Sequence, residues 1–170
     1  PLEGLMMGMR SGDIDAGAVI YLLAQEGMSV GELNAMLNRE SGLRGISGTS
    51  HDMRDIERGV LEGDPRAKLA FDMYEYRVRK YIGAYAAAMD GVDAIAFTAG
   101  IGEHSPMLRA QLCRNLTYLG VEIDAERNEV SGQEVEISTP NSRVRAFVIP
   151  TDEERVIARD TVAVVRRHQK

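Results

Sequence analysis

The chain has 170 residues, of which 44% are hydrophobic and 27% charged, and its formal net charge is −6 at pH 7. This composition is that of a folded globular protein, and it excludes a disordered, fibrous or collagen-like chain. The acidic balance argues against non-specific nucleic-acid binding, and no run of about 18 apolar residues is present to span a membrane. No secretory signal is visible at the start, so we expect a cytoplasmic protein that binds neither nucleic acid nor membrane.

Cysteine and histidine show no sign of a metal site. A single cysteine, Cys113, excludes an internal disulfide and a cysteine-based zinc site. The histidines His51, His104 and His168 lie far apart and lack metal-ligand spacing. The sequence opens at Pro1 rather than at a methionine, in a stretch already rich in Met and Gly, which indicates a piece of a longer protein.

The first half of the chain is predicted to be helical. Most of its helices begin at a side chain that caps the first turn, and they stop at glycine. The predicted helices run from Asp13 or Asp15 to Gly27, from a capping box of Ser29 and Glu32, over 53–60, and from Asp64–Pro65 to Gly91. The stretch 41–50 holds three glycines and is predicted to be a loop. Tyr74, Tyr81 and Tyr85 share one stripe of the longest helix, which we expect to pack in the core or at a dimer interface.

The second half alternates strands and helices. Apolar runs and alternating patterns predict strands at 94–97, 121–123, 134–137 and 144–149. Ser105 and Pro106 begin a helix that is predicted to run to Gly120, and Thr151 with Glu154 forms the capping box of a last helix. Strand–turn–helix units of this kind define an α/β fold.

A glycine turn follows the strand that ends at Phe97. The segment Ala99–His104 holds two glycines and leads to the helix start at Ser105. Glycine lets a ligand approach the backbone, and the free N–H groups of a helix start attract anions, so phosphate binding is one interpretation. An ordinary strand-to-helix turn shows the same pattern. A dinucleotide fingerprint fits less well, because Ser105 stands where its third glycine belongs.

Three further segments gather polar side chains at turns. Gly8–Asp15 places Arg10 beside two carboxylates, which suits binding of an anion, or else a surface charge next to a capped helix. Gly48–Asp55 could wrap a small molecule or form a plain surface loop. Pro150–Glu154 holds three acids, which suit Mg²⁺ bound together with a phosphate, or simply a helix cap.

Taken together and in this order, four segments resemble the C-terminal part of the acetate and propionate kinase family. They are PLEGLMMGMRSGDIDAG at 1–17, SGLRGISGTSHDMRDI at 41–56, FTAGIGEHS at 97–105 and VIPTDEERVIARD at 148–160. The resemblance covers essentially the whole chain. It implies a ribonuclease-H-like α/β domain of the superfamily of acetate and sugar kinases, heat-shock chaperone ATPases and actin. We therefore expect a C-terminal nucleotide-binding domain over 1–170 that is incomplete at its N-terminus.

The resemblance also implies an activity and the residues that carry it. The family reversibly transfers a phosphoryl group between ATP and acetate, giving acetyl phosphate and ADP, with Mg²⁺ or Mn²⁺. Such a transfer needs positioning and positive charge more than covalent help. By motif, Arg10 matches the catalytic arginine, Asp52, Met53 and Arg54 the adenosine segment, Gly100, Ile101, Gly102, Glu103 and His104 the turn that lines the nucleotide, and Glu153 the acid associated with the metal.

Five positions in these segments depart from the family pattern, among them Met9 in place of a threonine and Ala16 in place of a proline. Met53 stands in place of an aromatic residue, although methionine can still pack on a purine face. His104 replaces an asparagine, which changes one polar contact to the nucleotide. Ala99 replaces a frequent glycine, which we expect to be a mild change. No charged catalytic group is lost.

The resemblance places part of the catalytic site outside this sequence. In the family, an N-terminal domain supplies an asparagine near the metal, an arginine for acetate, and a catalytic aspartate and histidine. We therefore expect the chain to be inactive alone, to need that domain as a partner, and to form a homodimer through the family's dimer contact. Two alternatives stay open: a propionate kinase, and a non-catalytic nucleotide-binding module of the same superfamily.

Overall fold

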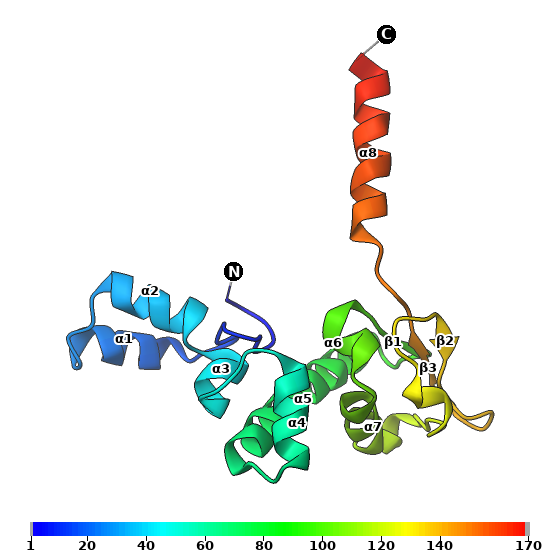
Figure 1. Cartoon of the computed structure of the whole chain (residues 1–170), viewed down its shortest axis with the longest axis horizontal. Coiled ribbons are helices and arrows are strands. Elements are labelled where there is room, and N and C mark those ends of the chain that lie inside the picture. Colours follow the sequence, from blue (N-terminus) through cyan, green and yellow to red (C-terminus); the bar gives the residue numbers. More distant parts are fainter. Residues whose placement is uncertain (1, 169–170) are drawn as a thin grey trace.

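A computed structural model describes residues 2–168, and Figure 1 shows how their elements are arranged. Pro1 and residues 169–170 of the predicted domain lie outside the described residues. The elements are α1 (Ala16–Ala24), α2 (Val30–Arg39), α3 (Gly42–Ser47), α4 (Met53–Leu61), α5 (Pro65–Ala88), β1 (Ala94–Phe97), α6 (Ala99–His104), α7 (Pro106–Arg114), the short 3-10 turns η1 (Thr117–Leu119) and η2 (Arg127–Glu129), β2 (Val135–Glu136), β3 (Arg145–Val148) and α8 (Glu153–His168).

The three described strands form one small mixed sheet. The strand order is β1-β3-β2, with β1 parallel to β3 and β2 antiparallel to it. Phe97 at the end of β1 is paired with Val148 at the end of β3, so the chain leaves both parallel strands at the same edge. The strand predicted at 121–123 forms only isolated bridges, from Val121 to Val144 and from Ile123 to Ser138. The predicted α/β class is confirmed.

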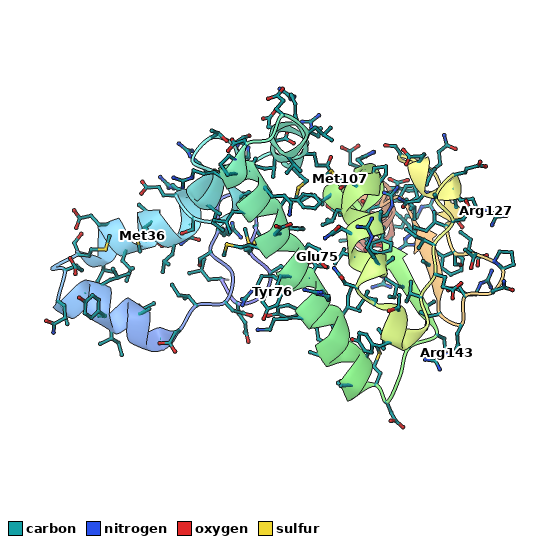
Figure 2. All side chains as sticks on the ribbon, turned by 90° about the horizontal axis from the view of Figure 1, so that it is seen from below. Met36, Glu75, Tyr76, Met107, Arg127 and Arg143 are labelled. Carbon is teal, nitrogen blue, oxygen red and sulfur yellow. The ribbon has the colours of Figure 1, made fainter. Side chains whose placement is uncertain are left out.

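The core lies around the long helix α5. Helices α3 and α4 pack against this helix, and so does α7, which covers the sheet. The fully buried side chains at the centre are Leu43, Ile56, Leu112, Leu116, Val121, Ile137, Val144 and Val148. Two glutamates of the described chain are buried, Glu75 and Glu103. Glu75 on α5 accepts a hydrogen bond from Asn115 Nδ2 at 3.1 Å, and Figure 2 shows it midway along the helix.

Two parts of the chain lie outside this core. Helix α1 has no buried residue and forms a hairpin with α2 at one end of the molecule. Helix α8 projects from the sheet, and its side chains from Glu153 to Arg167 are exposed (Figure 1). Within residues 2–168, no helix combines the length and the apolar character that are needed to cross a bilayer.

Capping patterns predicted most helix starts. Asp15 accepts a hydrogen bond from Ala18 N, Ser29 and Glu32 form the expected capping box, and Asp64 accepts from Arg66 N. Ser105 caps α7 by accepting from Leu108 N at 3.1 Å. These predictions are confirmed. They could be made from the sequence because capping depends on residues within one turn of the helix start.

Two predicted loops are helices instead. The stretch 41–50 holds α3. Gly42 begins this helix at φ +63°, and a Cβ on Gly42 would lie 2.1 Å from Met7 O. Gly48 ends the helix at φ +76°. Glycine permits the close approach at one end and the left-handed cap at the other. The turn predicted at 99–104 is α6.

Two predictions about helix ends are also wrong. The helix from Pro106 stops at Arg114 and is followed by η1 rather than continuing to Gly120. Thr151 does not cap the last helix, because its hydroxyl donates to Glu103 instead. Asp152 takes that place, with its carboxylate accepting from Arg155 N at 3.0 Å.

Candidate functional site

A cleft of about 650 Å³ lies between the start of α4 and the junction of α6 with α7. Its lining comes from both segments that the sequence analysis assigned to the nucleotide, and from four further residues. The lining residues are His51, Asp52, Met53, Arg54, Glu57, Gly100, Ile101, His104, Ser105 and Ser131. The fold therefore brings the 52–54 segment and the 100–104 segment to the two sides of one cavity.

The α4 side of the cleft is held by an ion pair. The Asp52 carboxylate caps α4 by accepting from Arg54 N at 2.9 Å, and it also accepts from Arg54 Nε at 3.0 Å. These hydrogen bonds from Arg54 lower the pKa of Asp52 to about 2, so the carboxylate is charged at neutral pH. Met53 is buried in the core at 4% exposure. The Asp52 cap and the burial of Met53 therefore anchor the backbone of this wall, while the Arg54 side chain is exposed.

The α6 side depends on two glycines with different surroundings. A Cβ on Gly102 would lie 3.2 Å from the carbonyl carbon of Phe97, so this glycine lets α6 pack on the end of β1. A Cβ on Gly100 would meet nothing within 4 Å, and Gly100 lines the cleft. Only Gly100 therefore leaves space that a ligand can use directly.

Ala99 begins α6 in the left-handed region, at φ +58°. An L residue with a Cβ costs roughly 1–2 kcal/mol more than glycine in that conformation. The expectation that alanine is a mild replacement for glycine here is therefore wrong, since the backbone demands the conformation that glycine adopts most easily.

Glu103 does not face the cleft. Its buried carboxylate accepts hydrogen bonds from Thr151 N at 2.8 Å and from Thr151 Oγ1 at 3.0 Å. The bond from the Thr151 backbone is the main cause of a lowered pKa for Glu103. This side chain ties α6 to the segment that begins α8.

One hydrogen bond joins the two walls of the cleft, and a second lies at its rim. Ser105 Oγ donates to the carboxylate of Glu57, which links α7 to α4. His104 Nδ1 lies 2.7 Å from Ser131 Oγ at the rim. Sequence reasoning missed Glu57 and Ser131 as lining residues. Glu57 follows Met53 by one helical turn, so helix periodicity could have found it, whereas the irregular segment around Ser131 carried no signal.

Arg10 lies in a neighbouring hollow of about 690 Å³. His51 lines this hollow as well as the cleft, and a Cβ on Gly8 would lie 2.8 Å from His51 O. The loop around Arg10 is fixed by its backbone, since Met7 N donates to Arg10 O at 3.0 Å and Ser11 N to Leu37 O at 3.0 Å. The exposed Arg10 side chain has no hydrogen bond or ion pair within residues 2–168. Its guanidinium is therefore open to an anionic ligand beside the cleft.

Glu153 begins α8 with an exposed side chain and lines neither the cleft nor the Arg10 hollow. No group of three His, Cys, Asp or Glu residues in the described part of the chain could hold a metal ion. Mg²⁺ commonly takes only one or two carboxylates, with phosphate oxygens and water as its other ligands. Exposed Asp152 and Glu153 fit that kind of partial donor set, and they do not form a complete cage.

Comparison with known proteins gives the class and then the family. The fold is that of solved acetate kinases, within the acetate and sugar kinase and actin-like class: it matches Porphyromonas gingivalis acetate kinase with a TM-score of 0.90 at 46% identity, over 97% of this chain and 42% of that one. A propionate kinase from Francisella tularensis matches with a TM-score of 0.83 at 40% identity, over 91% of this chain and 39% of that one. The chain belongs to the acetokinase family, whose model matches residues 1–159.

The curated relatives are longer than this chain. Acetate kinase from Fervidobacterium nodosum is 55% identical over 172 residues, which cover 100% of this chain and 42% of the relative. The chain therefore spans less than half the length of that relative, and the structure described above corresponds to one part of it.

Proposed function

We propose that this chain forms the nucleotide-binding part of a kinase that reversibly transfers a phosphoryl group between ATP and acetate. The observation that carries the proposal is the junction at His51, where the cleft between α4 and α6 meets the hollow that holds Arg10. A nucleotide needs a largely apolar cavity for its base and a positive group for its phosphates, and this junction offers both.

In this proposal, adenosine lies in the cleft between the Asp52–Arg54 and Gly100–His104 segments, and the phosphate chain passes His51 toward Arg10. An acetate oxygen attacks the γ-phosphorus, the bond from that phosphorus to the β,γ-bridging oxygen breaks, and ADP leaves. Arg10 binds the equatorial oxygens as charge spreads over them, which stabilises the transition state. The absence of any partner for its guanidinium among residues 2–168 supports this role.

Mg²⁺ or Mn²⁺ is the metal we propose for the reaction. When bound, it would neutralise charge on the phosphate oxygens. Glu153 is the residue that would hold it, directly or through water, because its exposed carboxylate makes no hydrogen bond or ion pair within the described chain. Glu103 bonds Thr151 and so fixes the segment from which Glu153 begins α8.

The acceptor side of the site is proposed to lie outside these 170 residues. This chain covers 42% of its acetate kinase relative, and we assign the cleft to the nucleotide and the hollow, lined by Arg10 and Arg39, to the transferred phosphoryl group. We infer that an N-terminal domain of the parent protein supplies the acetate site. We also infer that the parent is a cytoplasmic homodimer and that the chain alone does not catalyse transfer, because both sides must close to exclude water.

The test is acetyl phosphate formation by the parent protein with ATP and Mg²⁺, trapped as the hydroxamate, and the same assay on the isolated chain. We expect turnover by the parent and none by the chain. Parallel kcat/KM values for acetate and propionate decide the second candidate, propionate kinase, which the match to the Francisella protein favours. A parent that binds ADP but phosphorylates neither acid would be a non-catalytic nucleotide-binding module, which would contradict the proposal.

A further inference from the structure

Arg109 on α7 is a buried cation whose hydrogen bonds all go to neutral oxygens. Its side chain is 0% exposed. Nε donates to Asn128 Oδ1 at 3.0 Å, Nη1 donates to Gly102 O at 2.8 Å and Glu103 O at 3.0 Å, and Nη2 donates to Asn128 O at 2.6 Å and Val130 O at 2.7 Å. No carboxylate of the described chain lies within ion-pair distance of this guanidinium.

The oxygens that Arg109 binds belong to two segments that meet at the cleft rim, where His104 contacts Ser131. Gly102 and Glu103 directly precede His104, the last residue of α6, and Gly100, Ile101 and His104 of this helix line the cleft. Val130 directly precedes Ser131, which also lines it. Asn128 extends the network by donating from Nδ2 to Pro106 O at 2.9 Å. The side chains of His104 and Ser131 lie 2.7 Å apart, and Arg109 bonds the carbonyl oxygen of the residue that precedes each of them. Arg109 does not line the cleft itself.

This arrangement has an energetic cost that core packing alone does not explain. Burial lowers the pKa of Arg109, which reflects the loss of hydration of its charge. An apolar side chain of similar volume would avoid that cost, but it would take a donor from four backbone carbonyls and from the Asn128 side chain. A lysine would keep the charge but offers three donors from one nitrogen, whereas the planar guanidinium makes five bonds in fixed directions. What only arginine supplies here is the fixed placement of α6 relative to 128–131.

We propose that Arg109 is the positioning residue of the nucleotide cleft: it holds α6 and the 128–131 segment at the separation that nucleotide binding requires. The inference rests on the proposed function, because the ligand of the cleft is the nucleotide named there. Arg109 acts through Gly102, Glu103 and Val130. Its loss therefore weakens nucleotide binding while the Arg10 side of the site, and with it the chemical step, is affected much less.

The test uses the intact parent protein with ADP as the probe. ADP affinity is measured by calorimetry, and KM for ATP and kcat are measured by turnover, for wild type, Arg109→Lys and Arg143→Lys. Arg143, labelled in Figure 2, is the control: its exposed side chain also donates to a backbone carbonyl, Leu119 O at 2.7 Å, and it lines no part of the cleft. We expect Arg109→Lys to weaken ADP binding and raise KM for ATP by about 10- to 100-fold, with kcat changed less than threefold, as for a displaced binding group.

Hydrogen exchange separates positioning from general loss of stability. In Arg109→Lys, amides of 98–104 and 128–132 should exchange faster, while those of β3 keep the wild-type rate. Uniformly faster exchange that includes β3, or ADP affinity equal to wild type, would overturn the proposal. If Arg109→Lys does not fold, Asn128→Ala, which removes the acceptor of Arg109 Nε, decides in the same assays. A wild-type parent that does not bind ADP would instead contradict the proposed function.

Discussion

The walls of the cleft and the charged groups beside it are built in opposite ways. In the walls, Asp52 is paired with Arg54, Glu103 is bonded to Thr151, and Arg109 has all its hydrogen bonds satisfied. Outside the walls, the side chains of Arg10, in the neighbouring hollow, and Glu153, at the start of α8, are exposed and bond to nothing within residues 2–168.

This difference separates the groups that we propose hold the nucleotide from the groups that we propose act on the transferred phosphoryl group. A site that must fit one nucleotide is best fixed in advance, because every group that is ordered on binding costs affinity. A group that stabilises transferred charge must instead be available to the substrate. Substitutions in the walls should therefore change binding, and substitutions at the open groups should change turnover.

The largest expected effect is at Arg10. In the parent protein, Arg10→Ala should lower kcat by about 10³ or more, because a phosphoryl-stabilising arginine acts in the transition state. ADP affinity should change much less, since the cleft walls are intact. Arg44→Ala serves as the control, because Arg44 is also an exposed arginine and it lies on α3. A variant at Arg10 with near-normal turnover would remove the distinction between the two regions.

The two glycines of α6 sharpen the comparison within one wall. Gly100→Val should weaken ADP binding by about tenfold while the protein remains stable, since Gly100 lines the cleft and a Cβ there meets no protein atom within 4 Å. Gly102→Val should lower the free energy of unfolding by about 1–3 kcal/mol, because its Cβ presses on the backbone of Phe97. Calorimetry with ADP and urea unfolding measure the two effects. Equal losses of affinity without loss of stability would show that Gly102 also borders the ligand.

Ala99 is a position where a substitution should raise the stability of the protein rather than lower it. Ala99→Gly should raise the free energy of unfolding by about 0.5–1 kcal/mol, because glycine removes the strain at φ +58° but adds freedom to the unfolded chain. Ala84→Gly is the matched control on the exposed face of α5, and it should destabilise by about 0.5–1 kcal/mol. Thermal or urea unfolding distinguishes the two signs. A destabilising Ala99→Gly would mean that the left-handed start of α6 is not strained.

The smallest effect is a pH response of the α4 wall. The pKa of Asp52 is lowered to about 2 from 3.8, so the pair with Arg54 stabilises the fold above the unfolded value and loses that contribution as pH falls toward 2. Carbon NMR of the Asp52 carboxyl should give a midpoint near 2, and Arg54→Gln should move it upward. A wild-type midpoint near 4 would show that the pair does not persist in solution.

The sequence predicted local features of the fold better than the packing between them. Helix starts at Asp15, Ser29, Asp64 and Ser105 were predictable, since a cap and its partner lie within one turn. Helices α3 and α6 were missed because their glycines resemble breakers, whereas Gly42 packs under Met7 O and Gly102 packs on Phe97. Contacts of that kind depend on segments distant in sequence, which local patterns do not contain.

The candidate site was predictable only in part, and for the same reason. The resemblance of four segments to one family pointed to residues 52–54 and 100–104, and the fold places both along one cleft. The direction of Glu103 toward Thr151, and the inclusion of Ser131, follow from tertiary hydrogen bonds. The motif match assigned Glu103 to the nucleotide together with its neighbours. A motif match depends on which residues are adjacent in sequence, and it contains no information on where a side chain points.

The most direct test of the account is a structure of the parent protein with ADP bound. We predict adenosine between the Asp52–Arg54 and Gly100–His104 segments, with the phosphates extending past His51 toward Arg10. The guanidinium of Arg109 should keep its bonds to the carbonyl oxygens of Gly102 and Val130 in that complex. ADP bound elsewhere, with neither segment in contact with it, would contradict the assignment of the cleft.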